Sequence, residues 1–219
     1  MTAETAGALG ALADGDASIR LRAALAIGMN PAPDTGAVDS LVARCAIEPE
    51  FSVREMLTWA LTRHDPAATV PRLLPELRSP LAQARSQALH TLSKIGDPRT
   101  WASITRDLLL DADDEVARAA WRTAVAFVPE GEECALASVL TTQFARGSRE
   151  TRLSLSRALI GLGEEVLPAL HAAMEDPDPA VRAHAIATEQ LYRDPEAGFT
   201  LAVEEAKRVV ALGPDEVRW

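Results

Sequence analysis

The sequence of 219 residues predicts an all-α fold, in which about six helical hairpins stack into a right-handed α-α superhelix (a solenoid) and one more helix caps the C-terminal end. Three observations predict this fold. One arginine recurs at a nearly constant interval, helix-breaking residues separate segments of helical periodicity, and only 4% of the residues are aromatic although 47% are hydrophobic. A fixed interval of this size is typical of stacked repeats. A core of alanine and leucine suits closely packed helices better than a β-sandwich.

The recurring arginine marks the second helix of each hairpin, and the gaps between its copies are 34, 31, 33, 34 and 30 residues. The six copies are Arg20, Arg54, Arg85, Arg118, Arg152 and Arg182. Apolar residues stand one position before, three after and seven after the arginine, on one helical face that we expect to be buried between layers. Glu189 is the exception. The second helices are predicted at 18–29, 52–63, 81–95, 115–127, 149–162 and 180–192.

The first helices precede them in each hairpin and are predicted at 5–13, 35–48, 66–77, 100–110, 132–144 and 164–174. Gly96-Asp97-Pro98 shows how hairpins are separated, because it stops one helix and places a proline in the first turn of the next. A last helix at 195–212 is predicted to cover the end of the stack. The sequence therefore predicts a single repeat domain over 1–219, with repeats at 3–30, 34–64, 65–96, 97–129, 130–162 and 163–193 and the cap at 195–212.

The net charge of -10 disfavours binding to nucleic acid or to an anionic membrane surface. The sequence starts without a basic segment followed by a long apolar run, and no apolar stretch reaches the length of a membrane span. Cys45 and Cys134 fall in the first helices of the second and fifth hairpins, too far apart for a disulfide. Two free thiols indicate a reducing compartment, so we expect a cytoplasmic protein.

Several segments together resemble HEAT repeats, most of all the short bacterial variety also found in phycobilisome-lyase subunits. They are Leu73-Leu74-Pro75-Glu76-Leu77, Val166-Leu167-Pro168-Ala169-Leu170 and Asp176-Pro177-Asp178-Pro179-Ala180-Val181-Arg182. The resemblance implies stacked hairpins whose second helices line a concave face. It also implies that the repeated arginine is structural and pairs with an acidic group or with backbone carbonyls at the turn inside its own repeat. The turn Arg146-Gly147-Ser148-Arg149 of the fifth repeat departs from the family pattern.

No motif for catalysis or for metal binding is present in the sequence. It has neither a nucleophile elbow nor a phosphate-binding loop, and its four histidines lack the spacing of a zinc site. We therefore expect a protein that is not an enzyme and that needs no cofactor or metal.

Candidate binding residues are found two, five and nine positions after the repeated arginine, where they would form a stripe on the concave face. The large or polar ones, with one neighbour of the stripe, are Met56, Trp59, Arg63, Gln87, His90, Lys94, Arg122 and Arg157. An aromatic residue beside cations suits an acidic peptide or another anionic ligand. The alternative is that Trp59 packs against the next layer and that the cations are solvated.

These observations favour an interaction scaffold, expected to be monomeric, that holds a protein or peptide of unknown identity on its concave face. A lyase-like chaperone or an accessory subunit of an enzyme is an alternative, and it would need an apolar pocket for a small prosthetic group. A HEAT-like DNA glycosylase is a third possibility. Trp59, Trp121 and Asp113 would supply its residue types, but the acidity of the chain argues against it.

Overall fold

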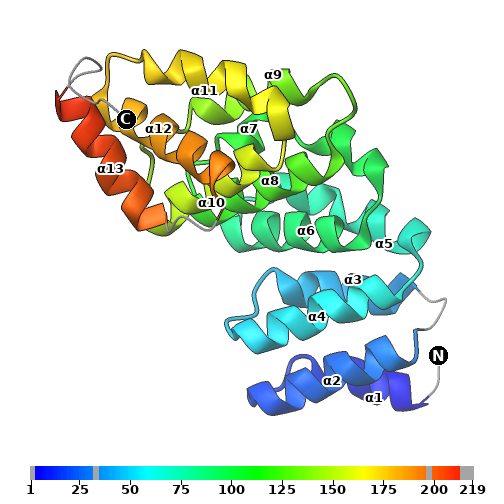
Figure 1. Ribbon diagram of the computed structural model, residues 1–219. Helices are drawn as coiled ribbons and strands as arrows, with labels where there is room; N and C mark the ends of the chain where they lie inside the picture. Colours follow the sequence, from blue (N-terminus) through cyan, green and yellow to red (C-terminus); the bar gives the residue numbers. More distant parts are fainter. Residues whose placement is uncertain (1–2, 32–34, 196–198, 213–219) are drawn as a thin grey trace. The chain divides into compact units, whose positions relative to one another are not determined.

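The computed structural model describes residues 3–31, 35–195 and 199–212, and these residues confirm the all-α prediction. Helices are paired throughout, and the described ranges contain no strand (Figure 1). The chain divides into two compact units, Met1–Thr123 and Ala124–Trp219. The predicted extent of one domain over the whole chain stays a prediction. No helix in the described ranges has both the length and the apolar character that a membrane crossing requires.

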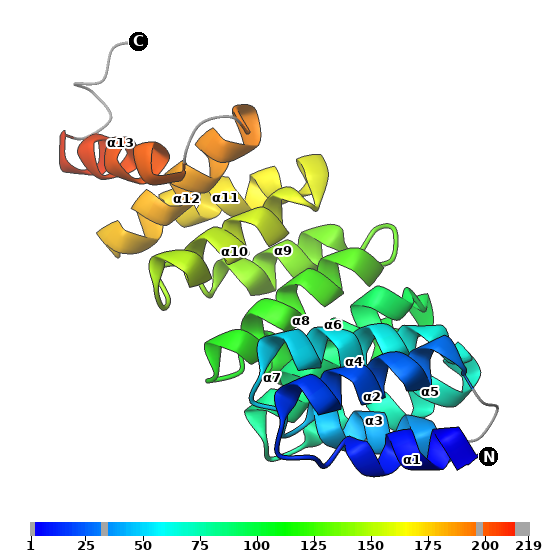
Figure 2. The ribbon, with the colours of Figure 1, turned by 90° about the horizontal axis from the view of Figure 1, so that it is seen from below.

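The first unit consists of successive helical pairs, with the second helices side by side (Figure 2). Helix α2 packs on α4 and α4 on α6, while α1, α3 and α5 with η1 each pair with the second helix that follows them. The elements are α1 (Ala3–Ala11), α2 (Ala17–Met29), α3 (Thr35–Cys45), α4 (Phe51–Arg63), α5 (Pro66–Leu73), η1 (Pro75–Arg78), α6 (Ala82–Ile95), η2 (Pro98–Ser103), α7 (Arg106–Leu109) and α8 (Asp114–Phe127), where η marks a 3-10 helix. The last residues of α8 belong to the second unit.

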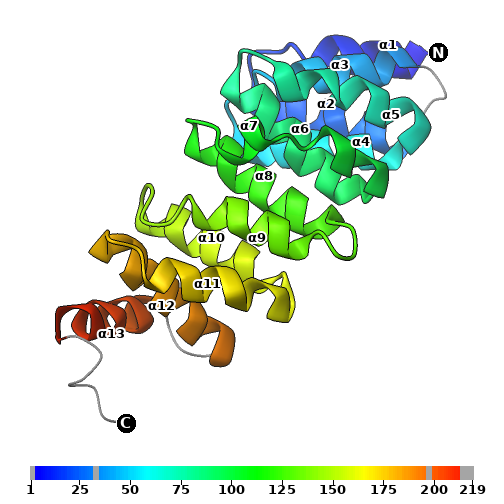
Figure 3. The same ribbon diagram turned by 90° about the horizontal axis from the view of Figure 1, so that it is seen from above.

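The second unit continues the same plan with two further pairs and a final helix (Figure 3). Helix α12 packs on α10 and α11, which precede it in the chain, and on α13, which follows it. The elements are α9 (Glu133–Thr141), α10 (Arg149–Ile160), η3 (Gly163–Val166), α11 (Leu167–Met174), α12 (Pro179–Arg193) and α13 (Phe199–Leu212). The predicted last helix began at Pro195, and residues 196–198 of that prediction lie outside the described residues.

Acidic and hydroxyl side chains fix where several helices begin. Asp16, Asp65, Asp97 and Asp178 each accept the backbone N–H two residues ahead, and Ser148 accepts that of Thr151. These bonds satisfy N–H groups that the first turn of a helix leaves without a partner. Helix α6 ends at Gly96, whose φ of 78° is readily adopted only by glycine.

The centre of the predicted core face is buried in every repeat, while Ile19, Val125 and Val181 at its edges are half-buried. The residue three positions after the repeated arginine is at most 5% exposed in every repeat, as shown by Ala23, Leu57, Ala88, Trp121, Leu155 and Ala185. Trp121 is fully buried, and its indole N–H donates to the carbonyl of Leu109 at 2.8 Å. This bond ties α8 to the first half of its own repeat. The pattern breaks where predicted, since Glu189 is half-buried and binds Arg193 and His171.

The prediction of one continuous first helix at 100–110 was wrong. The chain forms η2 and the short helix α7 instead, with Ile104 and Thr105 extended between them. Serine and β-branched residues in Ser103-Ile104-Thr105 favour a helix weakly. The predicted helices at 66–77 and 164–174 are likewise each divided into an α-helix and a 3-10 helix.

Candidate functional site

Four of the six repeated arginines bind the backbone of their own repeat turn. Arg20, Arg54, Arg85 and Arg182 each donate from Nη1 to the carbonyl six residues earlier, at 2.9, 3.0, 2.9 and 2.7 Å respectively. Arg20, Arg54 and Arg182 also donate to the next carbonyl in the chain. These bonds hold the turn against the second helix. They give these arginines the structural role that the sequence analysis assigned to them.

The acidic partners of two of these arginines come from the following repeat, and not from the turn six residues earlier. Arg20 donates to both carboxylate oxygens of Glu48 at 2.8 and 2.7 Å, and Arg85 does the same to Asp111 at 2.8 and 3.0 Å. Arg44 also donates to Glu48 at 2.7 Å. Burial alone would raise the pKa of Glu48, but hydrogen bonds from Arg20, the Glu50 backbone and Arg44 outweigh it and hold that pKa at about 2.

Arg118 and Arg152 do not follow this pattern. Arg118 donates to the exposed carboxylate of Glu115, three residues earlier, at 2.7 Å. In both arginines Nε is buried and has no hydrogen-bond partner among the described residues. The structure therefore contradicts a uniform arginine ladder in the fourth and fifth repeats.

Trp59 is a packing residue. Its ring covers Gly28 of α2 so closely that a β-carbon added at Gly28 would lie 2.4 Å from Cζ3 of Trp59. Trp59 therefore packs on α2 of the preceding layer, whereas the alternative considered for it placed it against the next layer. The equivalent stripe positions in the fourth repeat, Ala120 and Thr123, are also buried between helices. The predicted stripe is therefore not a continuous exposed surface, because some of its positions are buried in the core.

The remaining predicted residues lie on helices of both units. Met56 is half-buried on α4, and Arg63 is exposed in the last turn of that helix. Arg157 is exposed on α10, in the second unit. Gln87, His90 and Lys94 share α6, and Arg122 lies on α8.

His90 is the centre of a polar group on the first unit. Its Nε2 lies 3.3 Å from Oε1 of Glu55 on α4, although the two atoms lack hydrogen-bond alignment. Burial lowers the pKa of His90, and the nearby charges of Lys94 and Arg122 lower it further against the opposing effect of Glu55. We call Glu55, Gln87, His90, Lys94 and Arg122 the His90 cluster. It draws on three successive second helices.

The His90 cluster has hydrogen-bonding capacity that the described residues do not use. The side-chain oxygen of Gln87 and Nε2 of His90 are buried without a hydrogen-bond partner there. Lys94 and Arg122 are exposed and form no ion pair with any described residue. Although Arg122 is exposed as a whole residue, partial burial of its guanidinium and the charge of Arg118 lower its pKa, and Glu115 partly offsets this. The arrangement can therefore accept an anionic group.

Glu55 is the member of this cluster that the sequence analysis missed. It stands one residue after Arg54, outside the stripe positions, and nothing in the sequence marks it as a neighbour of His90. Among the described residues, no three His, Cys, Asp or Glu side chains lie where they could share a metal ion.

Two residues named for the DNA glycosylase alternative have structural roles. Trp121 is fully buried, and Asp113 accepts the backbone N–H groups of Glu115 and Val116 at the start of α8. Neither is available for a base or a sugar in this arrangement.

The family described as HEAT repeats matches residues 38–126, which include most of the second, third and fourth hairpins. No curated protein matches the chain. An engineered protein is similar in structure at 16% identity and a TM-score of 0.47, over 95% of this chain and 98% of its own. Human deoxyhypusine hydroxylase in complex with glycerol is similar at 18% identity and a TM-score of 0.47, over 95% of this chain and 94% of its own. The complex of CpcE and CpcF of phycocyanin lyase from Nostoc sp. PCC7120 is similar at 17% identity and a TM-score of 0.36, over 96% of this chain and 96% of its own.

Proposed function

Because the chain is a HEAT-repeat protein, we propose that it is a non-enzymatic binding module and that its first unit holds an acidic segment of a partner protein at the His90 cluster. Lys94 and Arg122 are the observation that carries this proposal. Both are exposed beside His90 and form no ion pair with the described residues, in a chain whose net charge is -10. Two such cations that lie together beside His90 suit an anionic partner.

The cluster also offers selectivity beyond charge. His90 is neutral near pH 7, because its pKa lies below the ordinary 6.5, so Lys94 and Arg122 supply the positive charge. The unused side-chain oxygen of Gln87 can accept a hydrogen bond from a peptide N–H of the partner, whereas a carboxylate of the partner would be held by Lys94 and Arg122. The helices that carry these residues are packed in the free protein, so little ordering is needed for binding. The two free thiols suit a cytoplasmic location for this function.

The test uses fluorescence anisotropy with a fluorescein-labelled array of acidic peptides, followed by salt titration of those that bind. We expect binding that weakens as salt rises. The double variant Lys94→Glu with Arg122→Glu should bind at least about tenfold more weakly. A matched control, Arg78→Glu with Arg106→Glu, makes the same charge change at exposed positions on η1 and α7 and should bind as the wild type does.

Equal loss of binding in both double variants would refute the assignment to the His90 cluster, since it would show a response to net charge alone. A labelled DNA duplex in the same assay tests the nucleic-acid alternative. We expect no binding of that duplex, because a phosphate backbone is repelled by the acidic chain.

A further inference from the structure

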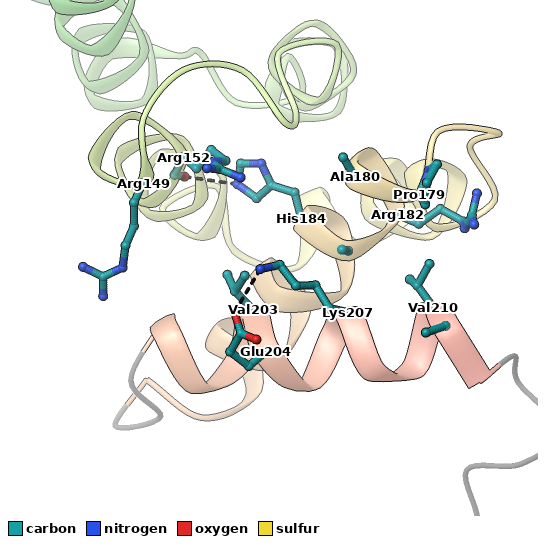
Figure 4. A pocket seen from close by; sticks show the side chains of 12 residues that line it. Arg149, Arg152, Pro179, Ala180, Arg182, His184, Val203, Glu204, Lys207 and Val210 are labelled. Carbon is teal, nitrogen blue, oxygen red and sulfur yellow. Dashed lines mark hydrogen bonds and ion pairs between the residues drawn. The ribbon is translucent and has the colours of Figure 1, made fainter.

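The second unit contains a cavity of about 570 Å³ between α10, α12 and α13 (Figure 4). Its size is within the range of about 300–1,000 Å³ that small-molecule sites occupy. Two kinds of side chain line it. Cations come from Arg149, Arg152, Arg182 and Lys207, and apolar groups from Pro179, Ala180, Ala183, Val203, Val210 and Ala211.

Arg152 differs from the four repeated arginines that bind their own turn, and its turn has another shape. Ala145 and Gly147 adopt φ values of 64° and 68°, and the backbone N–H of Ala145 donates to Nδ1 of His184 at 3.0 Å. Among the described residues, Nε of Arg152 has no hydrogen-bond partner, whereas Arg182 donates to the carbonyls of Asp176 and Pro177 of its own turn. Arg152 is one of the residues that line the cavity, and its unpartnered Nε is buried.

A buried guanidinium donor without an acceptor is costly, and an anion is the group that relieves this cost most directly. Glu204 is the only acidic side chain among the described residues that line the cavity, and it is already bound to Lys207 at 2.9 Å. Figure 4 shows this pair on α13 facing α12, with Arg152 next to His184. Among the described lining residues, cations therefore outnumber carboxylates, in a chain of net charge -10.

The opposite part of the lining is apolar. Val203 and Val210 stand on α13, and Ala183 belongs to a buried cluster with Ala187, Leu191 and Ala206 behind the cavity. Small residues at Ala180 and Ala183 leave the space open between α12 and α13. An apolar chain or ring lying here would be removed from water, which favours binding in proportion to the apolar area covered.

We propose that this cavity binds a small amphiphilic carboxylate, with its head group at Arg152 and its apolar body along Val203 and Val210. A carboxylate matches the planar fork of a guanidinium. The inference does not depend on the proposed function, because it concerns other residues in the other unit.

Isothermal titration calorimetry with sodium decanoate tests the proposal, with 1-decanol and decyltrimethylammonium as neutral and cationic analogues. We expect saturable binding of decanoate and none of the cationic analogue. Equal binding of the alcohol would overturn the assignment of a charged head group. Tighter binding of decyl phosphate than of decanoate would overturn the choice of a carboxylate.

Two variants locate the site. Arg152→Gln should weaken decanoate binding at least about tenfold. Ala180→Phe should abolish binding by filling the cavity, since Ala180 is an exposed lining residue that adds little to the core. Arg157→Gln is the matched control, because it removes an exposed charge from the same helix outside the lining. Circular dichroism checks that each variant is folded. Unchanged binding in Ala180→Phe would overturn the proposal even if Arg152→Gln did not fold.

Discussion

Arg20 and Glu48 form a buried ion pair that joins α2 to the turn between α3 and α4. Arg20 is 4% exposed and Glu48 is fully buried, and two hydrogen bonds of 2.8 and 2.7 Å link them. Glu48 also accepts from Arg44 and from the backbone N–H of Glu50. Both oxygens of the Glu48 carboxylate therefore accept hydrogen bonds, and the loss of Arg20 would leave much of this buried negative charge uncompensated.

We expect Arg20→Met to lower the free energy of unfolding by about 3–5 kcal/mol, which is the usual cost of removing one member of a buried ion pair. Arg118→Met is the matched control. Arg118 bonds only to an exposed glutamate, so its loss should cost about 0–1 kcal/mol. Urea unfolding followed by circular dichroism measures both. Similar losses in the two variants would contradict the different roles that the structure gives them.

The interval of the arginines predicted where the second helices lie, because a period fixed by hairpin length must appear in the sequence. It could not predict which acid each arginine meets. Glu48 lies six residues before Arg54, in the turn of the same repeat, yet its side chain binds Arg20 of the preceding repeat and only its backbone carbonyl binds Arg54. Contacts between layers depend on how hairpins stack, and residue spacing within one repeat does not contain that information.

Stability should depend on pH through His184. Burial lowers the pKa of His184 to about 4, and the charge of Arg152 acts in the same direction, while the carbonyl of Arg152 opposes it. The folded state therefore holds this histidine neutral, whereas the unfolded chain binds a proton near pH 6.5. Since the unfolded state binds more protons, the stabilisation is complete above pH 6.5 and is lost as the pH falls toward 4.

Acidification from pH 7.5 to 4.5 should thus lower the free energy of unfolding by roughly 2–3 kcal/mol through this residue. The variant His184→Gln cannot titrate and should show a correspondingly flatter dependence over the same interval. Urea unfolding at several pH values checks this. Parallel curves for wild type and variant would show that His184 is not the source.

The candidate site was only partly predictable for a related reason. The spacing placed Gln87, His90 and Lys94 on one face of α6, which follows from helix geometry alone. It could not show that Trp59 leans on Gly28, 31 positions earlier, since that contact depends on how closely α2 and α4 approach. The available signal was a glycine inside the predicted helix at 18–29. Glycine weakens a helix, so its presence there indicates that another element approaches the backbone closely.

Gly28→Ala should therefore destabilise the first unit. The added β-carbon would meet Cζ3 of Trp59 at 2.4 Å and the α-carbon of Ala60 at 2.9 Å, so α2 and α4 would have to separate. We expect a loss of about 1–3 kcal/mol, as for other overpacked cores. Gly7→Ala in α1 is the control, because its β-carbon would meet nothing within 4 Å. That variant should be neutral or slightly stabilising, and a loss of stability in both would argue against the contact with Trp59.

The two thiols should react very differently with a disulfide reagent such as DTNB. Cys45 is buried, and burial raises its pKa to about 12. Cys134 is exposed, but a hydrogen bond to Glu165, 3.0 Å away, raises its pKa as well. Only the thiolate reacts. At pH 8 the native protein should therefore release one equivalent of the coloured thiol slowly, and a second only after unfolding in urea.

The variant Glu165→Gln separates the effect of the carboxylate from that of exposure. It removes the negative charge beside Cys134 and should accelerate the first reaction, because a thiolate forms more readily without a neighbouring anion. Glu164→Gln changes the adjacent exposed glutamate and should leave the rate unchanged. If Glu165→Gln reacts at the wild-type rate, Glu165 does not control this thiol. If Cys45 reacts at native conditions, the packing of α3 is looser than its burial indicates.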